Sequence, residues 1–547
     1  METKIQNEKP CLVETPQGFS VFYRNKFLYS KYAPARSICQ TIEKLALLPG
    51  TLFLCCSPVL TYGLSELLSK LDDSSFCLLC EFDSQLDAFS RERPDFSKIK
   101  DMKKAARLTL PELQQLPVIL NQPSYTTMEG TQLLPAGTFK RVIRLDFSAG
   151  TQFHNELYDE LTAACTTAIM TFWANRMTLV KFGRKYSQNF FKNLKILAQT
   201  SPITNFFGSV SKPIIVFGAG ESTDKGIKKI KDKADDFFII CADTALQPLL
   251  KNGIEADAVF VEEAQSVIKK AFIGTKNNKT RLFAGMSAAA NLYKIFGKER
   301  LSFFTTKYSS ASFLQGLSDK KIIPPMNEAF GSVGLTALYY ALRFRSSEDI
   351  PVFIYGLDFS YSAGLTHAKG SMAVAERHIR STRLLPPASY AAAFNTLAEK
   401  VLSKDGRCFY TTRTLKNYAE LFKGLFCGIK NLFDSSDCGI NLNLPYKEPQ
   451  AANTVISAPL QPLPFGNEEK KVIQNYLLEE KKILERLRDL LTGKEKLTAE
   501  EQRNQITKLA SEREYLFLHF ADGINFKYET SFLKRIRTEI DFFLKFF

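Results

Sequence analysis

The chain has 547 residues, of which 45% are hydrophobic and 24% are charged, with 28 glycines and 23 prolines. This composition excludes collagen, a wholly disordered chain and a small disulfide scaffold, and the length allows three or four domains. The 72 basic and 57 acidic residues give a net charge of +15, which suggests an anionic partner: nucleic acid, a membrane surface or a phosphorylated small molecule.

The first ten residues are polar and lack the apolar segment of a secretory signal, and no run of about 18 apolar residues predicts a transmembrane helix. The 11 cysteines are odd in number and scattered from Cys11 to Cys438, which is typical of reduced thiols in a cytoplasmic protein. Cys77 and Cys80 have the spacing of a metal-ligand pair, but they lie in the apolar run FCLLC. We interpret them as core thiols of a strand, and we expect no metal site.

Residues 1–150 are predicted to form an N-terminal α/β domain that begins with a β-hairpin. The expected elements are a hairpin at 17–31, a helix at 38–48, a strand from 51, a helix at 64–71 and a strand at 76–82. This alternation favours a parallel strand–helix–strand unit. Residues 95–150 give no clear pattern.

A helical connector is predicted at 151–204, followed by a central Rossmann-like, doubly wound domain at 205–445. Its six expected strands are PIIVFGAG, FFIICAD, DAVFVE, RLFAG, LSFFTT and VFIYGLDF, with helical patterns between most of them. A proline-rich linker at 446–468 precedes a lysine-, glutamate- and leucine-rich segment at 469–547, which predicts a C-terminal helical bundle.

The turn after the first central strand carries the strongest local signal. Gly218, Ala219 and Gly220 lead from an apolar strand into a lysine-rich helical pattern. Glycines let a ligand approach the backbone closely, and a helix N-terminus favours a phosphate. Ser222 could cap that helix or bond a phosphate oxygen. The third glycine of the dinucleotide-binding pattern is missing, so a plain tight turn is the alternative.

Acidic residues end the next two predicted strands. Asp243, which precedes Thr244, lies about 25 residues after the glycines, where a carboxylate often accepts ribose hydroxyls. A helix N-cap is the alternative for Asp243. Glu262 ends the third strand at the edge where open α/β sheets bind ligands, and it either contacts a ligand or is only solvated.

Later segments add further candidates at the same predicted edge. Gly331 and Ser332 open the helical pattern LTALYYALRF, where small residues suit either a ligand or helix–sheet packing. Asp358 ends a strand and is followed by a polar loop with Tyr361, an arrangement typical of a site.

His367 and His378 flank a basic stretch and are the candidate catalytic residues. Histidine is the natural general base near neutral pH, and the neighbouring basic residues could hold a diphosphate or a departing nucleotide. The alternative for each histidine is an ordinary surface position. The combination is more specific than any single feature, because the candidates that follow strands share one edge of the predicted sheet.

Several segments resemble the motility-associated factor (Maf) family. They are GAGESTDKGIKKIKDKADDFFIICADTALQPLLKNGIEADAVFVEE, GSVGLTALYYAL and IYGLDFSYSAGLTHAKGS, followed by FYTTRTLKNYAEL and NLFDSSDCGINLNL. The resemblance covers roughly 205–445. Maf proteins are similar to flagellin glycosyltransferases that use nonulosonic, sialic-acid-like sugars.

The resemblance implies a Rossmann-type domain related to bacterial sialyltransferases, which use CMP-activated sugars, and a flagellin acceptor. Carried over by position, the nucleotide-sugar contacts are Gly218, Gly220, Ser222, Asp243, Glu262, Gly331 and Ser332, with Tyr361 near the phosphate. His367 matches a Maf motif, whereas His378 falls in the lid that carries the general base in the relatives.

In the N-terminal domain, the glycine-rich turn of the Maf family is replaced by Cys55-Cys56-Ser57-Pro58, and Gly63 alone remains of its glycines. Without those glycines a backbone cannot come close to a phosphate. We therefore predict that this domain binds no nucleotide and serves as a scaffold or an acceptor-binding surface.

Two other functions stay open. The domain family is also similar to MptE-like archaeal 6-hydroxymethylpterin diphosphokinases, whose reaction needs ATP and Mg²⁺, and Asp243 and Glu262 could supply ligands. A non-catalytic, flagellin-binding member is the second. Nucleic-acid binding is disfavoured, because the sequence has no recognition motif and no basic stripe with interleaved aromatics.

Overall fold

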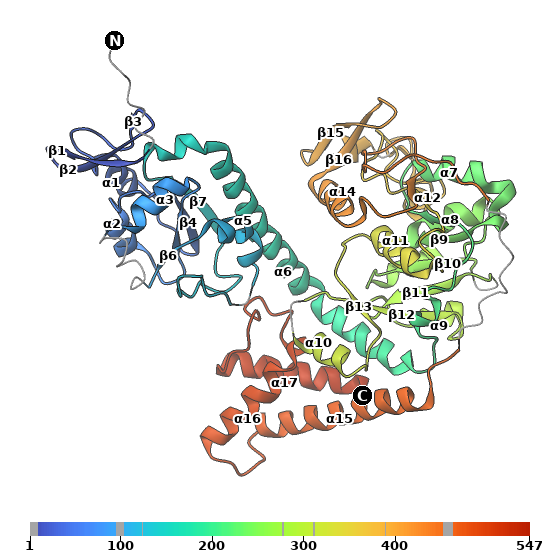
Figure 1. Cartoon of the computed structure of the whole chain (residues 1–547). Helices are drawn as coiled ribbons and strands as arrows, with labels where there is room; N and C mark the ends of the chain where they lie inside the picture. Colours follow the sequence, from blue (N-terminus) through green and yellow to red (C-terminus); the bar gives the residue numbers. More distant parts are fainter. Residues whose placement is uncertain are drawn as a thin grey trace. The chain divides into compact units, whose positions relative to one another are not determined.

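The computed structural model describes residues 9–93, 103–122, 124–275, 278–309, 312–388, 390–451 and 463–547. The chain divides into two compact units, Met1–Lys181 and Phe182–Phe547 (Figure 1). The fold class predicted from the sequence is confirmed: a β-hairpin with a small α/β domain, a Rossmann-like parallel sheet and C-terminal helices.

The first unit begins with the predicted hairpin, which starts earlier than the sequence pattern indicates. Strands β1 (Cys11–Thr15), β2 (Gly18–Tyr23) and β3 (Lys26–Phe27) form an antiparallel sheet. The turn between β2 and β3 places Arg24 and Asn25 at positive φ, as a tight turn requires.

A four-stranded parallel sheet forms the core of the first unit, in the order β6-β5-β4-β7. Its strands are β4 (Thr51–Cys56), β5 (Phe76–Cys80), β6 (Ala105–Arg107) and β7 (Arg141–Asp146). The helices are α1 (Arg36–Glu43), α2 (Leu64–Lys70), α3 (Ser84–Arg91) and α5 (Leu110–Ile119). Strand β5 is buried throughout, so Cys77 and Cys80 are core thiols.

Helix α6 (Asn155–Leu197) contributes residues to both units and is 43 residues long. The predicted connector contains no proline and one glycine between 155 and 197, so nothing in its sequence interrupts the helix.

The second unit is built on an eight-stranded, entirely parallel sheet in the order β13-β12-β11-β10-β9-β8-β14-β17. The strands that the sequence predicts are β8 (Ile214–Phe217), β9 (Phe238–Ala242), β10 (Ala258–Val261), β11 (Arg281–Gly285), β12 (Leu301–Thr306) and β14 (Val352–Tyr355). Strands β13 (Met326–Asn327) and β17 (Leu432–Asp434) complete the edges.

The strand order reverses between β8 and β14. The chain adds β9 to β13 one after another on one side of β8, and then returns to lay β14 along the other side. Such a reversal is a topological switch point, and ligands of open α/β sheets bind outside the carboxyl ends of the strands there.

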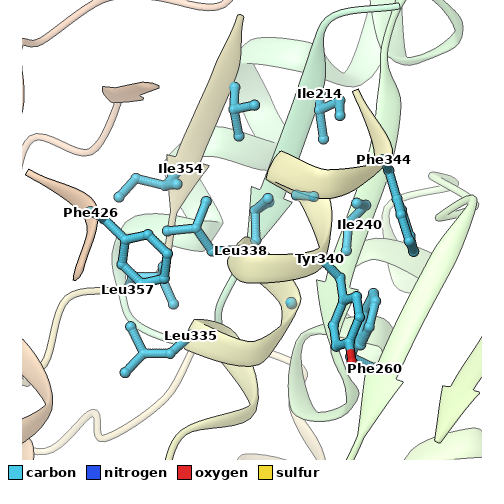
Figure 2. Packing of buried hydrophobic residues seen from close by; sticks show 14 of the residues in the cluster. Ile214, Ile240, Phe260, Leu335, Leu338, Tyr340, Phe344, Ile354, Leu357 and Phe426 are labelled. Carbon is cyan, nitrogen blue, oxygen red and sulfur yellow. The ribbon is translucent and has the colours of Figure 1, made fainter. Parts of the chain in front are cut away.

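Helix α11 (Val333–Phe344) packs against β8, β9 and β10 and forms the main core (Figure 2). Ile214, Ile240 and Phe260 come from these three strands, and Leu338 and Tyr340 come from the helix. The rings of Phe260 and Tyr340 stack with centroids 5.5 Å apart. Burying each large side chain contributes about 1.5–3 kcal/mol, so this packing fixes the position of the α11 N-terminus above the sheet.

The remaining helices of the second unit connect strands or follow the sheet. They are α7 (Ser222–Ile230), α8 (Asp243–Lys251), α9 (Tyr293–Phe296), α10 (Ser312–Asp319), α12 (Met372–Arg380), α13 (Tyr390–Ala393) and α14 (Arg413–Phe426). Strands β15 (Ala398–Leu402) and β16 (Cys408–Thr412) form a separate antiparallel hairpin.

The C-terminal helices are α15 (Asn467–Leu491), α16 (Ala499–Ser511) and α17 (Thr530–Phe543), and α15 packs against both others. Much of the predicted linker, including Pro459 and Pro462, lies outside the described residues. Among the helices that the structure describes, none combines the length and the apolar character of a membrane span.

Candidate functional site

The predicted residues that follow β8, β9 and β10 lie at one edge of the sheet. The three strands are adjacent and parallel, and Gly218, Asp243 and Glu262 each come directly after a strand end. Because carboxyl ends of parallel strands meet at one edge, the structure gathers these residues at the edge predicted for ligand binding.

The backbones after β8 and β14 pass very close to each other at the switch point. A Cβ atom added at Gly218 would lie 2.3 Å from the carbonyl oxygen of Gly356. A Cβ atom at Gly220 would lie 2.4 Å from Asp358 Oδ2. Both glycines are therefore required by packing inside the protein, in addition to any role in ligand binding.

The carboxylate of Asp358 lies at the N-terminus of α7. The Ser222 backbone N–H donates to Asp358 Oδ2 at 2.8 Å, and the Ser222 hydroxyl donates to Oδ1 at 2.5 Å. The same hydroxyl accepts a hydrogen bond from the Gly356 N–H at 2.7 Å. Burial raises the pKa of Asp358 to about 6, and its side chain is 1% exposed.

This arrangement changes what the glycine turn can offer a ligand. The polar groups of Ser222, predicted to contact a phosphate, contact Asp358 here. A carboxylate at a helix N-terminus already interacts with the helix dipole, and a second anion there would be repelled. The contact of Ser222 with a ligand stays a prediction, and the structure gives Ser222 and Asp358 a role in joining α7 to β14.

The loop after β14 is tied across the turn after β8. The Ala368 N–H donates to the Ala219 carbonyl at 2.8 Å, and the Lys369 N–H donates to the Asp224 carboxylate. His367 precedes this attachment point, so the structure brings it next to the glycine turn. Burial lowers the pKa of His367 below its usual 6.5, which leaves the imidazole neutral and able to accept a proton at pH 7.

The described contacts do not join Tyr361 or His378 to the glycine turn. Tyr361 is buried, and its hydroxyl donates to the Ala392 carbonyl at 2.8 Å. His378 is exposed on α12, and the described contacts do not bring it to the sheet edge. Its catalytic role stays a prediction.

Asp243 is the first residue of α8 and not a side-chain N-cap. Its carboxylate is 5% exposed and accepts a hydrogen bond from the Thr244 hydroxyl at 2.8 Å. Burial is the main cause that raises the pKa of Asp243 to about 6, and the charges of Glu263 and Glu262 contribute to that rise. Carboxylates from adjacent strand ends therefore lie close enough to influence one another.

Glu262 is half-buried and held by two threonines that the sequence analysis did not single out. The Thr306 hydroxyl donates to Oε1 at 2.5 Å, and the Thr336 hydroxyl donates to Oε2 at 2.9 Å. Thr306 ends β12 and Thr336 lies in the first turns of α11. Burial raises the pKa of Glu262, and these hydrogen bonds oppose that shift.

Gly331 and Ser332 precede α11, with Gly331 exposed at positive φ and Ser332 at the N-cap position. A Cβ atom at Gly331 would lie 2.5 Å from the ring of Tyr418, which comes from α14. Burial raises the pKa of Tyr418, and the negative charge of Glu262 adds to that rise. The Tyr418 phenol therefore lies near the Glu262 carboxylate.

Sequence reasoning thus missed Thr306, Thr336 and Tyr418. Thr306 is a polar residue at the end of a predicted strand, and that position was a usable signal. Tyr418 lies in the middle of a helix far along the chain, and no local pattern marks it.

Comparisons with known proteins agree with this architecture. Residues 188–364 match the profile of the family described as 6-hydroxymethylpterin diphosphokinase MptE-like. A protein of Treponema pallidum (strain Nichols), described as uncharacterized, is 32% identical over 561 aligned positions, covering 98% of this chain and 94% of that protein. The solved structure of a Maf glycosyltransferase from Magnetospirillum magneticum AMB-1 superposes with a TM-score of 0.56 at 13% identity, covering 99% of this chain and 92% of that one. The resemblance to Maf proteins is therefore confirmed as a shared fold.

Proposed function

The chain belongs to the same protein family as the Treponema pallidum protein, and from its Maf-like fold we propose that it is a glycosyltransferase. In the proposed reaction, a nonulosonic acid passes from a CMP-linked donor to a serine or threonine hydroxyl of flagellin. The observation that carries the proposal is the group of polar side chains gathered at the carboxyl edge of β8, β9 and β10.

In the proposal, the donor lies over Asp243, Thr244 and Glu262, at the N-terminus of α11. The carboxylates accept hydrogen bonds from hydroxyl groups of the ribose or the sugar, and these contacts do not need a glycine loop. The N–H groups at the start of α11 and the small residues Gly331 and Ser332 face the phosphate, since among the described residues no side chain accepts a hydrogen bond from the first backbone N–H groups of this helix. The site is then supported from within the protein by the packed residues Gly218, Gly220, Ser222 and Asp358.

The chemistry requires a base for the acceptor hydroxyl. The hydroxyl oxygen forms a bond to the anomeric carbon, and the bond from that carbon to the CMP phosphate oxygen breaks. CMP leaves with the electron pair, and the hydroxyl proton passes to the imidazole of His367. A positioned base contributes about 10²–10⁴-fold to such a step.

The test is a transfer reaction with purified protein, CMP-pseudaminic or CMP-legionaminic acid, and flagellin monomer. A mass gain on flagellin supports the proposal. Glu262→Gln should abolish the gain, because an amide cannot accept from both threonines and a ligand equally well. Glu420→Gln, an exposed change on α14, is the matched control. No mass gain under conditions in which an authentic Maf enzyme works contradicts the proposal.

A pterin diphosphokinase is the second candidate, favoured by the profile match over residues 188–364. The two functions differ in their nucleotide. Stabilisation by ATP with Mg²⁺, and not by CMP, would favour pyrophosphoryl transfer. A member that binds flagellin without catalysis would bind flagellin but show neither stabilisation by CMP nor transfer of the sugar.

A further inference from the structure

One segment of the second unit exposes an unusual concentration of large apolar side chains. It lies between β14 and β16 and includes α12, α13 and β15. Figure 1 labels α12, β15 and β16 of this region. Helix α12 contains no buried residue. The exposed apolar residues are Ile379, Leu384, Leu385, Phe394, Leu397 and Leu402, which we call the 379–402 surface. Leu384 is 92% exposed and Ile379 is 84% exposed, so neither contributes to a core.

Isolated exposed apolar residues are ordinary, but six in one short segment are not. An apolar group left in water contributes nothing to folding, whereas covering it on binding releases about 25 cal/mol per Å². The physical expectation for such a segment is a partner that covers it.

The surface adjoins the candidate site. The Tyr361 hydroxyl, in the loop that also carries His367, donates to the Ala392 carbonyl within the segment. Phe394 packs edge-to-face against Tyr410, with ring centroids 5.7 Å apart. On the other side, Glu376 of α12 pairs with Lys270, which follows β10. A partner on this surface would lie beside the edge where we place the donor.

The charges of the segment select the kind of partner. Its acidic residues Glu376 and Glu399 are neutralised by Lys270 and Lys416. The exposed Arg380 and Arg383 make no salt bridge within the part of the chain that the structure describes. The charge left over is therefore positive and lies next to apolar side chains, which complements an acidic and apolar surface.

We propose that the 379–402 surface docks the protein acceptor, by contact with a polypeptide segment that carries acidic and apolar side chains. The inference rests on the proposed glycosyl transfer and adds where the acceptor binds. A small donor cannot cover side chains on both α12 and β15. A second copy of this chain, docked through the same surface, would bring two sets of these arginines into one interface, which like-charge repulsion disfavours.

The experiment compares two double variants of the full chain. One is Leu384→Ser with Leu397→Ser, and the other is Arg380→Glu with Arg383→Glu. The control is Leu478→Ser, an exposed apolar residue on α15. Circular dichroism and melting temperature establish that each variant folds. The first measurement is the affinity for purified flagellin monomer, and the second is CMP release from the donor without acceptor.

We expect each double variant to bind flagellin at least 10-fold more weakly, and we expect Leu384→Ser with Leu397→Ser to release CMP at the wild-type rate. The control should match the wild type in both. Unchanged flagellin affinity in both double variants would overturn the proposal. A parallel loss of CMP release in the leucine double variant would also overturn it, because the apolar side chains would then act on the donor. Wild-type binding to vesicles of anionic phospholipid that the variants lose, with flagellin affinity kept, would assign the surface to a membrane and equally overturn the proposal.

The proposed glycosyl transfer and the proposed docking surface can be disproved independently of each other. If the wild type binds flagellin through this surface but never releases CMP or transfers sugar, the glycosyl transfer is wrong and the docking stands. If the wild type transfers sugar while the double variants keep the wild-type KM for flagellin, the docking is wrong and the transferase stands.

Discussion

Asp358 shows how one side chain can decide whether a helix end is free. A helix N-terminus attracts either a ligand anion or a carboxylate of the protein, and here Asp358 occupies that place on α7. The contact joins residues 136 positions apart in the chain. No local pattern indicates it, so the glycine turn could be predicted while its partner could not.

Asp358 also makes stability depend on pH. Its folded-state pKa of about 6 lies above the unfolded value of 3.8, so the folded protein binds the proton more tightly. Stability from this group is full below about pH 4 and is lost as the pH rises through 6. Asp358→Asn should remove this group's contribution to the slope in melting temperatures measured from pH 4 to 7, while Asp243, whose pKa burial also raises to about 6, keeps its own contribution. Asp358→Ala, which leaves the Ser222 N–H without its acceptor, should cost about 1–3 kcal/mol at every pH. A slope unchanged in Asp358→Asn contradicts this assignment.

His367 is the residue on which the proposed chemistry depends. His367→Ala should lower the transfer rate about 10²–10⁴-fold and leave CMP affinity unchanged, because the loss affects proton transfer and not binding. His378→Ala, on the exposed part of α12, serves as the comparison. Because the pKa of His367 is lowered, wild-type activity should persist below pH 6.5 and fall only when the imidazole is protonated. If His378→Ala lowers the transfer rate and His367→Ala does not, then His378 and not His367 is the general base.

At the scale of elements, the crossing of the turns after β8 and β14 is the tightest feature of the sheet edge. Gly356 has φ +71°, and a Cβ atom there would meet Thr223 Oγ1 at 2.0 Å. The sequence PIIVFGAG indicates the strand and the turn, but the second strand of the crossing comes from residues 352–355. The close approach of the two backbones depends on tertiary packing, so the local sequence does not indicate it.

Gly218→Ala tests the crossing directly. The added methyl group would meet backbone at 2.3 Å, and backbone cannot move away as a flexible side chain can. We expect a loss of about 3 kcal/mol in denaturant unfolding, or failure to accumulate as folded protein. Gly316→Ala in α10, where nothing lies within 4 Å of the new atom, is the matched control and should be neutral or slightly stabilising. Equal stabilities in the two variants would show that the crossing is not tight.

The strands that the sequence predicts share one feature, a long apolar run, and the strands that it misses lack that feature. Strands β8 to β12 and β14 are buried on both faces, so their sequences are nearly continuous apolar runs. Strands β13 and β17 have two and three residues and carry no periodicity. The hairpin β15–β16 pairs locally, but β15 has no buried residue and β16 has only two, so no continuous apolar run marks it.

At the scale of the whole molecule, the two parallel sheets differ at the same edge. In the first unit, Glu81 follows β5 and accepts hydrogen bonds from Ser57 and Tyr158, while Asp83 pairs with Arg24 from the hairpin. Glu81 and Asp83 are 7% and 3% exposed. In the first sheet Ser57 and Pro58 follow β4 where a glycine turn follows β8 in the second, so the first unit stays predicted to bind no nucleotide.

Ligand binding should therefore stabilise one unit only. A ligand at 100 times its Kd stabilises the protein that binds it by about 2.7 kcal/mol. CMP should shift the calorimetric transition of Phe182–Phe547 and leave that of Met1–Lys181 in place. Asp243→Ala should remove the shift. A CMP-dependent shift of the first unit's transition alone would place the nucleotide in the wrong sheet for our proposal.

All 11 cysteines are free thiols, and Cys408 and Cys427 are the two exposed ones. Cys408 is paired with Leu402 across the β15–β16 hairpin. A maleimide fluorophore would therefore attach next to the apolar segment without any engineered cysteine. The native chain therefore supplies an attachment site for a fluorescent reporter of protein binding.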